Sequence, residues 1–332
     1  MVRSWGTMRP MPGSLPDGRR LGAHLPVVGG LVAAVERAHA VGATTLQVFA
    51  DNPTAWRRRA EPPTDLAAFR ERLADLDMGP VAIHASYLIN LAGPDDEFRE
   101  RSVDVLAGEL RAARVFGARF VNVHIGSHRL TGLDDGIERF GDGVARVLAE
   151  VDNGPDAALL TFENAAGGGG VLGVSLDELE ALLESIASHG GDVSRVRLCL
   201  DTAHLWAAGL AIGDADAVDA LVEELDSRLG IDRLAMIHLN DSKTALGSGL
   251  DRHQHLGAGE IGVAGLRRLL TSPQLAGVTY YLETPGMDEG YDAINVARAY
   301  AIAAGEPLDA LPPEATSMRG GRARSGSQRA PD

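Results

Sequence analysis

Residue types that commonly bind transition metals stand at the ends of six apolar stretches with the character of β-strands. The residues at these ends are His84, His124, Glu163, Asp201, His204, His238 and Glu283, and a further element, DRHQH at 251–255, adds Asp251 and His253. Neutral imidazole and carboxylate suit Zn, Fe and Mn. Nine such groups exceed what one ion needs, because a catalytic zinc usually takes three protein ligands and keeps one position open. The pattern predicts a cluster of two or three metals and a metal-dependent hydrolase.

Each of these residues alone also has an ordinary structural explanation. A single histidine at a strand end is often a hydrogen-bonded polar residue, and a single carboxylate can cap a helix. If the strands converge, however, the crowded carboxylates would repel one another and shift their pKa values unless cations lay among them. We therefore favour metal binding for the set as a whole. His24, at the end of the first strand, is a candidate to orient a ligand, and His128 is a candidate to face the substrate or to orient a ligand.

Eight strand-like stretches, each followed by a helical pattern, fill residues 21–304. Apolar strands that alternate with helices are typical of a parallel sheet covered on its faces. Eight such units predict an α/β fold, the TIM (β/α)8 barrel. The alternative is an open doubly wound sheet, in which only the strands beside the switch point would converge on a site. Helix N-caps are expected at Thr64 and at Ser175, which is followed by Glu178.

The barrel is expected to lie between two Arg-rich tails, an N-terminal extension at 1–20 and a C-terminal tail at 305–332, both mostly disordered. The formal net charge is −15. Residues 1–20 carry +3 and residues 313–332 carry +2, so the rest of the chain carries −20. An acidic barrel argues against nonspecific nucleic-acid binding, but bound divalent ions would reverse the local sign.

The chain has a single cysteine, Cys199, which lies inside a strand-like stretch. One cysteine excludes an intrachain disulfide and fits a reducing compartment. The N-terminus lacks the apolar segment of a signal peptide, and no run of about 18 apolar residues indicates a membrane span. The sequence therefore predicts a cytoplasmic protein without a membrane partner. It shows no clear dimer surface, so we expect a monomer.

Longer motifs around the candidate ligands closely resemble the endonuclease IV family. These motifs are HASYLINL (84–91), NVHIGSH (122–128), FENAAGGG (162–169), CLDTAHLWAAG (199–209), HLNDSKTALGSGLDRHQHLGAG (238–259) and LET (282–284). The resemblance runs from about residue 21 to residue 304. It implies a deoxyribonuclease IV-type AP endonuclease of base excision repair. Such an enzyme hydrolyses the phosphodiester bond 5′ to an abasic site in double-stranded DNA and leaves a 3′-hydroxyl.

The same resemblance implies a site for three Zn2+ ions. His84, His124 and Glu163 would hold the first ion, Glu163, Asp201, His238 and Glu283 the second, and His204, Asp251 and His253 the third. Glu163 would bridge two ions that share a hydroxide nucleophile, which makes it the implied catalytic residue. Whether Mn or Fe replaces zinc at one position stays open.

Several residues near these ligands are candidate DNA contacts. Tyr87 and Leu88 follow His84 closely, and the family inserts such residues into the base stack at the lesion. From the residues alone, packing at the barrel rim is the alternative. The candidate phosphate contacts are Arg57, with Arg58 and Arg59 beside it, Arg129, Lys243 and Arg252. Thr54 departs from the family pattern, because some members carry an inserting basic residue there.

Two other functions compete with DNA repair. A metal-dependent sugar isomerase or epimerase can use the same barrel type, but it usually needs one or two metals and leaves the DRHQH element unexplained. A noncatalytic DNA-binding barrel has no use for an open metal site. We therefore favour the hydrolase.

Overall fold

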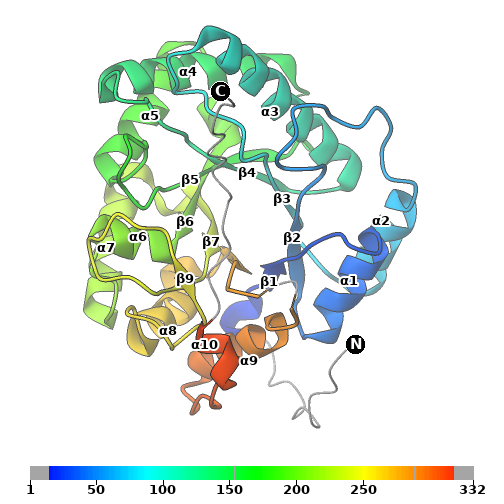
Figure 1. The fold of residues 1–332 in the computed structure, drawn as a ribbon, viewed down its shortest axis with the longest axis vertical. Coiled ribbons are helices and arrows are strands. Elements are labelled where there is room, and N and C mark those ends of the chain that lie inside the picture. The colour runs from blue at the N-terminus through cyan, green and yellow to red at the C-terminus, as the bar shows by residue number, and fades with distance from the viewer. Residues whose placement is uncertain (1–14, 153, 287–288, 318–332) are drawn as a thin grey trace, which may run out of the picture.

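The eight long strands form a closed parallel barrel in the structure, a computed structural model that describes residues 15–152, 154–286 and 289–317 (Figure 1). The strands are β1 (Leu21–His24), β2 (Thr45–Val48), β3 (Ala82–His84), β4 (Phe120–His124), β5 (Leu159–Glu163), β6 (Val196–Asp201), β7 (Leu234–His238) and β10 (Thr279–Leu282). Their order around the barrel is β1-β10-β7-β6-β5-β4-β3-β2. The predicted α/β TIM barrel is confirmed.

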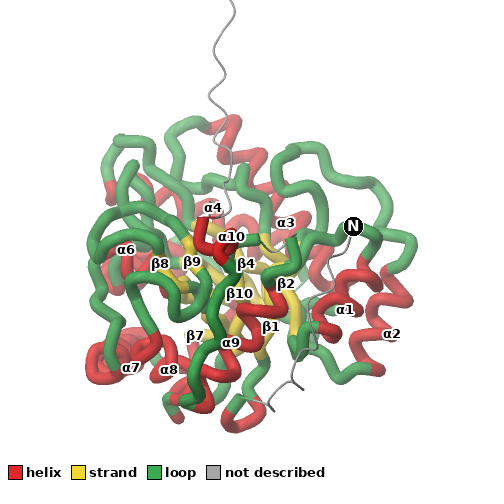
Figure 2. The backbone as a smooth tube through the Cα atoms, turned by 60° about the horizontal axis from the view of Figure 1, so that its bottom comes forward, coloured by secondary structure: helices red, strands yellow, loops and turns green. Residues whose placement is uncertain are grey.

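Helices surround the barrel and connect its strands (Figures 1 and 2). They are α1 (Leu31–Ala40), α2 (Leu66–Asp75), α3 (Asp96–Phe116), α4 (Leu133–Glu150), α5 (Leu176–Ser188), α6 (Thr202–Ala208), α7 (Ala215–Leu229), α8 (Val263–Thr271), α9 (Asp292–Ala304) and α10 (Pro313–Ser317). Two short strands, β8 (Asp241–Ser242) and β9 (His253–Gln254), pair as an antiparallel hairpin outside the barrel. Within the described ranges, no helix combines the length and the apolar character that a membrane span requires.

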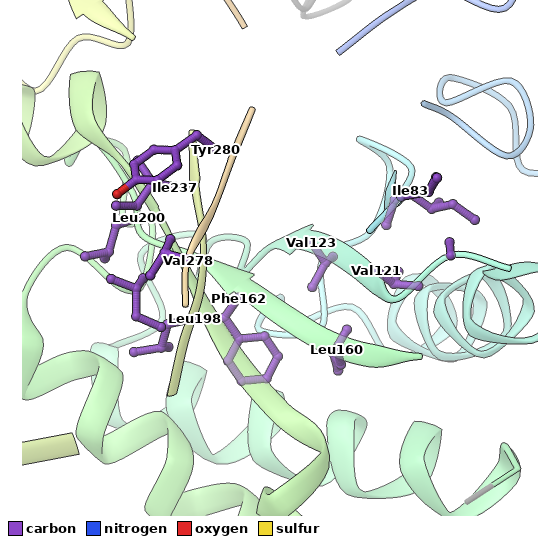
Figure 3. Packing of buried hydrophobic residues seen from close by; sticks show 14 of the residues in the cluster. Ile83, Val121, Val123, Leu160, Phe162, Leu198, Leu200, Ile237, Val278 and Tyr280 are labelled. Atoms are coloured by element: carbon purple, nitrogen blue, oxygen red, sulfur yellow. The ribbon is translucent and has the colours of Figure 1, made fainter. Parts of the chain in front are cut away.

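Alternation along the strands separates two hydrophobic clusters. The exception is β7, where Leu234 joins the outward-facing set at a register shift against β6. The outward-facing set packs against the helices, as Leu160 and Phe162 of β5 do in Figure 3. The inward-facing set is a small cluster that fills the barrel: Ala82, Phe120, Cys199, Met236 and Tyr281. Gly22 belongs to this interior, because a Cβ there would lie only 2.4 Å from the Thr45 carbonyl oxygen.

One expected helix cap is present and the other is not. Ser175 accepts a hydrogen bond from the Glu178 backbone N–H at 3.3 Å, so the prediction for α5 is confirmed. The cap at Thr64 is wrong, because the N-cap position of α2 is Asp65 and makes no side-chain cap. The Asp65 carboxylate instead accepts from the Leu31 N–H at 2.6 Å and so caps α1, a contact between distant segments.

Ordered structure extends beyond both predicted barrel boundaries. The short helix η1 (Pro16–Gly18) precedes β1, and the buried Arg19 side chain donates to the Leu270 and Ser272 carbonyls at 2.7 and 2.6 Å. The predicted N-terminal boundary at residue 20 is therefore too late. On the C-terminal side, α10 lies beside α9 and the hairpin of β8 and β9 (Figures 1 and 2). The disorder predicted for 1–14 and 318–332 concerns residues outside the described ranges.

Candidate metal centre

The inward alternation of the strands brings the ligand-type side chains together at one end of the barrel. The inward residues at the carboxyl ends are His24, Gln47, His84, His124, Glu163, Asp201 and His238, and Glu283 follows β10 directly. Strand register places His124 opposite Glu163 and Asp201 opposite His238. Active sites of TIM barrels lie at this end. The fold thus explains why residues that can bind metals recur at the ends of successive strands.

Three groups of these side chains have ligand atoms within 4.8 Å of one another. The groups are His84, His124 and Glu163; Glu163, Asp201, His238 and Glu283; and Asp201, His204 and His253. The first two match the predicted sets. In the third, Asp201 takes the place of Asp251, although the Asp251 carboxylate lies 3.4 Å from His204 Nε2 and 3.1 Å from His253 Nε2. All nine predicted residues are brought together, and their roles as ligands stay a prediction.

Glu163 occupies the centre of this cluster. Its fully buried Oε1 lies 3.4 Å from His238 Nδ1 and 3.3 Å from His204 Nδ1. Its Oε2 lies 3.8 Å from His84 Nε2 and 3.9 Å from His124 Nδ1. A single carboxylate therefore faces four imidazoles, and it belongs to two of the three ligand groups.

Three of the imidazoles are oriented by hydrogen bonds to backbone carbonyls. His84, His204 and His253 each use Nδ1 for this bond, at 2.8–2.9 Å, with the carbonyls of Ala85, Asn164 and Glu283 as acceptors. With Nδ1 committed to a carbonyl, Nε2 is the ring nitrogen left to face a metal. This pattern is typical of metal-binding histidines, whose second ring nitrogen is held by a neighbouring acceptor.

His238 is oriented the opposite way, by Gln47. The His238 Nε2–H donates to Gln47 Oε1 at 3.1 Å, which leaves Nδ1 facing Glu163 and Glu283. Gln47 Nε2 donates to Glu283 Oε1 at 2.7 Å, and His24 Nδ1 donates to the same oxygen at 2.8 Å. His24 and Gln47 thus both orient Glu283, and Gln47 also orients His238.

Two asparagines hold the carboxylates of Glu163 and Asp201. Asn122 Nδ2 donates to Glu163 Oε2, and Asn240 Nδ2 donates to Asp201 Oδ2, both at 2.6 Å. Sequence reasoning missed Gln47, Asn122 and Asn240 as site residues. The available signal was position: Gln47 lies near the carboxyl end of β2, and each asparagine lies two residues from a candidate histidine.

The electrostatics of the cluster fit a set of divalent cations. Burial alone would raise the pKa of the Glu163 carboxyl, but His124 and His238 hold that pKa well below its usual range. Burial would lower the pKa of His253, yet Asp201 and Asp251 raise it to about 10. Carboxylates and imidazoles thus compete for protons that metal ions would displace, because metal binding requires deprotonated ligands.

Unpaired buried atoms point to the same fit. In the part of the chain that the structure describes, Glu163 Oε1, His238 Nδ1 and His253 Nε2 are buried without a hydrogen-bond partner. Buried polar atoms are normally paired, and an exception calls for an explanation such as an ion. These three atoms all belong to the candidate ligand groups, so the residues present suit bound metals.

The candidate DNA contacts differ in how well they are placed. The Tyr87 side chain is 44% exposed, and its ring centroid lies 5.2 Å from the His84 ring and 6.1 Å from the His124 ring. It also contacts Phe49 at 5.3 Å. Leu88, beside it, is half-buried. Tyr87 is therefore a partly exposed aromatic side chain directly beside the candidate ligands, and its contact with DNA stays a prediction.

The candidate basic contacts also separate into two kinds. Arg57 and Arg252 are exposed at the barrel mouth, and Lys243 is half-buried, with its backbone N–H bonded to the Arg252 carbonyl at 2.8 Å. Arg58 instead pairs with Glu109 at 2.7 Å. The remaining candidates behave as follows: Arg59 bonds Asp51, Arg129 is exposed, and Thr54 is exposed and bonded to Asn52.

The C-terminal segment supports the hairpin that carries Asp251 and His253. His255, fully buried two residues on, accepts from Asn295 Nδ2 at 2.9 Å and faces the Ala315 carbonyl through Nε2 at 3.2 Å. Since Nδ1 accepts, Nε2 carries the proton and donates to α10. The short C-terminal helix is thus connected to the candidate third metal group through one imidazole.

Deleting residues 307–332 should loosen this hairpin, because His255 would lose its acceptor. We expect a melting temperature lower by at least about 2 °C and faster release of one bound ion to a chelator. A variant that lacks only 318–332 keeps α10 and is the matched control. Thermal melts and chelator-release kinetics test this, and equal behaviour of the two deletions would contradict it.

Comparison with known proteins places this chain in a family. The family model described as a xylose isomerase-like TIM barrel matches residues 35–304. A probable endonuclease 4 from Halothermothrix orenii is 37% identical over 282 residues, which cover 84% of this chain and 99% of that protein. The crystal structure of endonuclease IV from Thermus thermophilus superposes with a TM-score of 0.72 at 37% identity, over 85% of this chain and 98% of the other.

A more distant structure shares the fold alone. A D-tagatose 3-epimerase-like protein has a TM-score of 0.62 at 16% identity, over 86% of this chain and 98% of that one. The alignment with the Halothermothrix orenii relative covers nearly the whole length of that protein. Its name agrees with the family that the sequence motifs resemble. The chain belongs to the endonuclease IV family of xylose isomerase-like TIM barrels.

Proposed function

We propose that this protein is a DNA repair endonuclease that hydrolyses the phosphodiester bond 5′ to an abasic site in double-stranded DNA. The proposed products carry a 3′-hydroxyl, and the proposed site holds three zinc ions. The observation that supports this best is the central position of Glu163 among four histidines, with further carboxylates around them. The relatives named endonuclease 4 supply the reaction class.

The residues of the chain would hold the metals and orient the substrate. Glu163 would join two ions, because it belongs to two of the three ligand groups. When bound, divalent ions polarise a phosphodiester and make a water molecule acidic enough to attack as hydroxide. The exposed Arg57 and Arg252 would contact DNA phosphates, and Lys243 would do so from its half-buried position. The predicted monomeric state and cytoplasmic location stay predictions.

A sugar isomerase or epimerase is the alternative function. The epimerase-like neighbour shares only the fold, at 16% identity. The hairpin carrying Asp251 and His253 argues against this alternative, because one or two metals would leave it without a role. Purified protein should therefore cleave an abasic duplex and leave ketose and aldose sugars unchanged. Sugar conversion without DNA cleavage would refute the proposal.

Tyr87→Ala should weaken binding to abasic duplex far more than binding to intact duplex. The exposed ring beside His84 and His124 is placed to stack at a lesion. Stacking contributes about 1–3 kcal/mol per base, so we expect a selective loss of about tenfold or more. Tyr87→Phe keeps the ring and is the matched control. Titrations of both duplexes test this, and an equal small change on both, together with a lower melting temperature, would indicate rim packing instead.

A further inference from the structure

Two loops at the barrel mouth are joined by backbone and side-chain hydrogen bonds. One loop (49–65) connects β2 to α2, and the other (85–95) connects β3 to α3 and carries Tyr87. The Pro53 carbonyl accepts from the Ser86 hydroxyl at 2.7 Å and from the Tyr87 N–H at 3.1 Å. The backbone position of Tyr87 is therefore set by the neighbouring loop.

The first loop is in turn fastened to α3. The Arg58 guanidinium donates to Glu109 Oε1 at 2.7 Å and to the Asn52 carbonyl, next to Pro53, at 3.1 Å. A second connection is the Trp56 ring, which packs edge-on against Phe98 of α3 with centroids 4.9 Å apart. The loop thus has one polar and one aromatic attachment to the same helix.

The Arg58–Glu109 pair differs from the surface ion pairs of α3. Glu109 is only 4% exposed, whereas Glu97, which pairs with Arg101 on the same helix, has a 78% exposed side chain. Burial raises the pKa of the Glu109 carboxyl to about 7, although Arg58 opposes this shift. A buried charge of this kind is unfavourable unless it is paired. Arg58, in the loop, is the partner that the buried carboxylate of Glu109 requires.

We propose that Glu109 and Arg58 are positioning residues for lesion recognition, because their pair holds the loop that fixes Tyr87 beside His84. This inference rests on the proposed function. A preorganised loop reduces the conformational entropy that is lost on binding. Both residues lie outside the nine candidate ligands, so their effect should fall on DNA selectivity and leave metal content intact.

The test compares binding and cleavage of abasic and intact duplexes at pH 8, where the Glu109 carboxyl is ionised. Arg58→Gln and Glu109→Ala should each lower the preference for abasic duplex about three- to tenfold. KM for abasic duplex should rise, while kcat at saturating DNA and the measured metal content stay unchanged. Glu109→Gln keeps an oxygen acceptor for Arg58 and should retain most of the preference.

Two controls separate positioning from general stability. Leu221→Ala removes a buried side chain on α7 and should lower the melting temperature without changing the preference. Glu97→Gln breaks a surface pair on α3 and should change neither. The inference is overturned if the Arg58 and Glu109 variants keep the wild-type preference, or if Leu221→Ala lowers it equally. A wild-type protein with no preference for abasic duplex would overturn the proposed function as well.

Discussion

Glu163→Gln should abolish cleavage of abasic DNA while the protein still folds and binds the duplex. The substitution keeps the size of the side chain but removes the charge that faces four imidazoles. Residues that only support a metal ligand typically contribute about 10–100-fold. Loss of a bridging ligand should therefore lower kcat by roughly a thousandfold or more.

Single-turnover cleavage at saturating DNA measures this effect without interference from binding. Metal content must be determined on the same sample, because loss of the carboxylate should also release at least one ion. A folded Glu163→Gln protein that retains more than about a tenth of the wild-type kcat, a difference of only about 1.4 kcal/mol, would refute the bridging role.

Gln47→Leu should weaken metal retention about 10–100-fold, the range for side chains that orient metal ligands. Gln47 accepts from His238 Nε2 at 3.1 Å and donates to Glu283 Oε1 at 2.7 Å. Leucine fills a similar volume but makes neither bond, so the His238 ring and the Glu283 carboxylate lose their orientation. Competition with a fluorescent zinc chelator measures the change.

A neighbouring position supplies the control for Gln47. Leu46 lies one residue earlier on β2 and faces the opposite side of the strand, toward the helices. Leu46→Met keeps the apolar volume there and should leave metal retention unchanged. If Gln47→Leu binds zinc as tightly as the wild type, the hydrogen bonds from Gln47 do not orient the ligands.

The barrel and the ligand-type residues could be predicted because both depend on local pattern. His84, Glu163 and His238 each end an apolar strand, and eight parallel strands in a barrel leave only one place for such ends to meet. Convergence therefore follows from topology without any knowledge of distances. The pairing of Asp201 with His204 and His253 did not follow, because it depends on side-chain packing within the cluster.

The residues that support the site could not be predicted for the same physical reason. Gln47 acts on partners that are 191 and 236 residues away, and a glutamine at a strand end carries no signature of metal binding. Glu109 lies in a helix that also carries exposed carboxylates, and the helix sequence does not distinguish it from them. Its burial depends on the loop at 49–65, which carries its partner Arg58. Asp65 stands at the N-cap position of α2, yet its carboxylate caps α1.

Elemental analysis of carefully reconstituted wild-type protein tests the central claim most directly. The account predicts three divalent ions per chain, because eight of the nine candidate ligands form three groups at one end of the barrel and the ninth, Asp251, lies beside the third group. Cleavage of abasic duplex by the same sample should accompany that stoichiometry. A preparation that is folded and holds one ion or none would contradict the account.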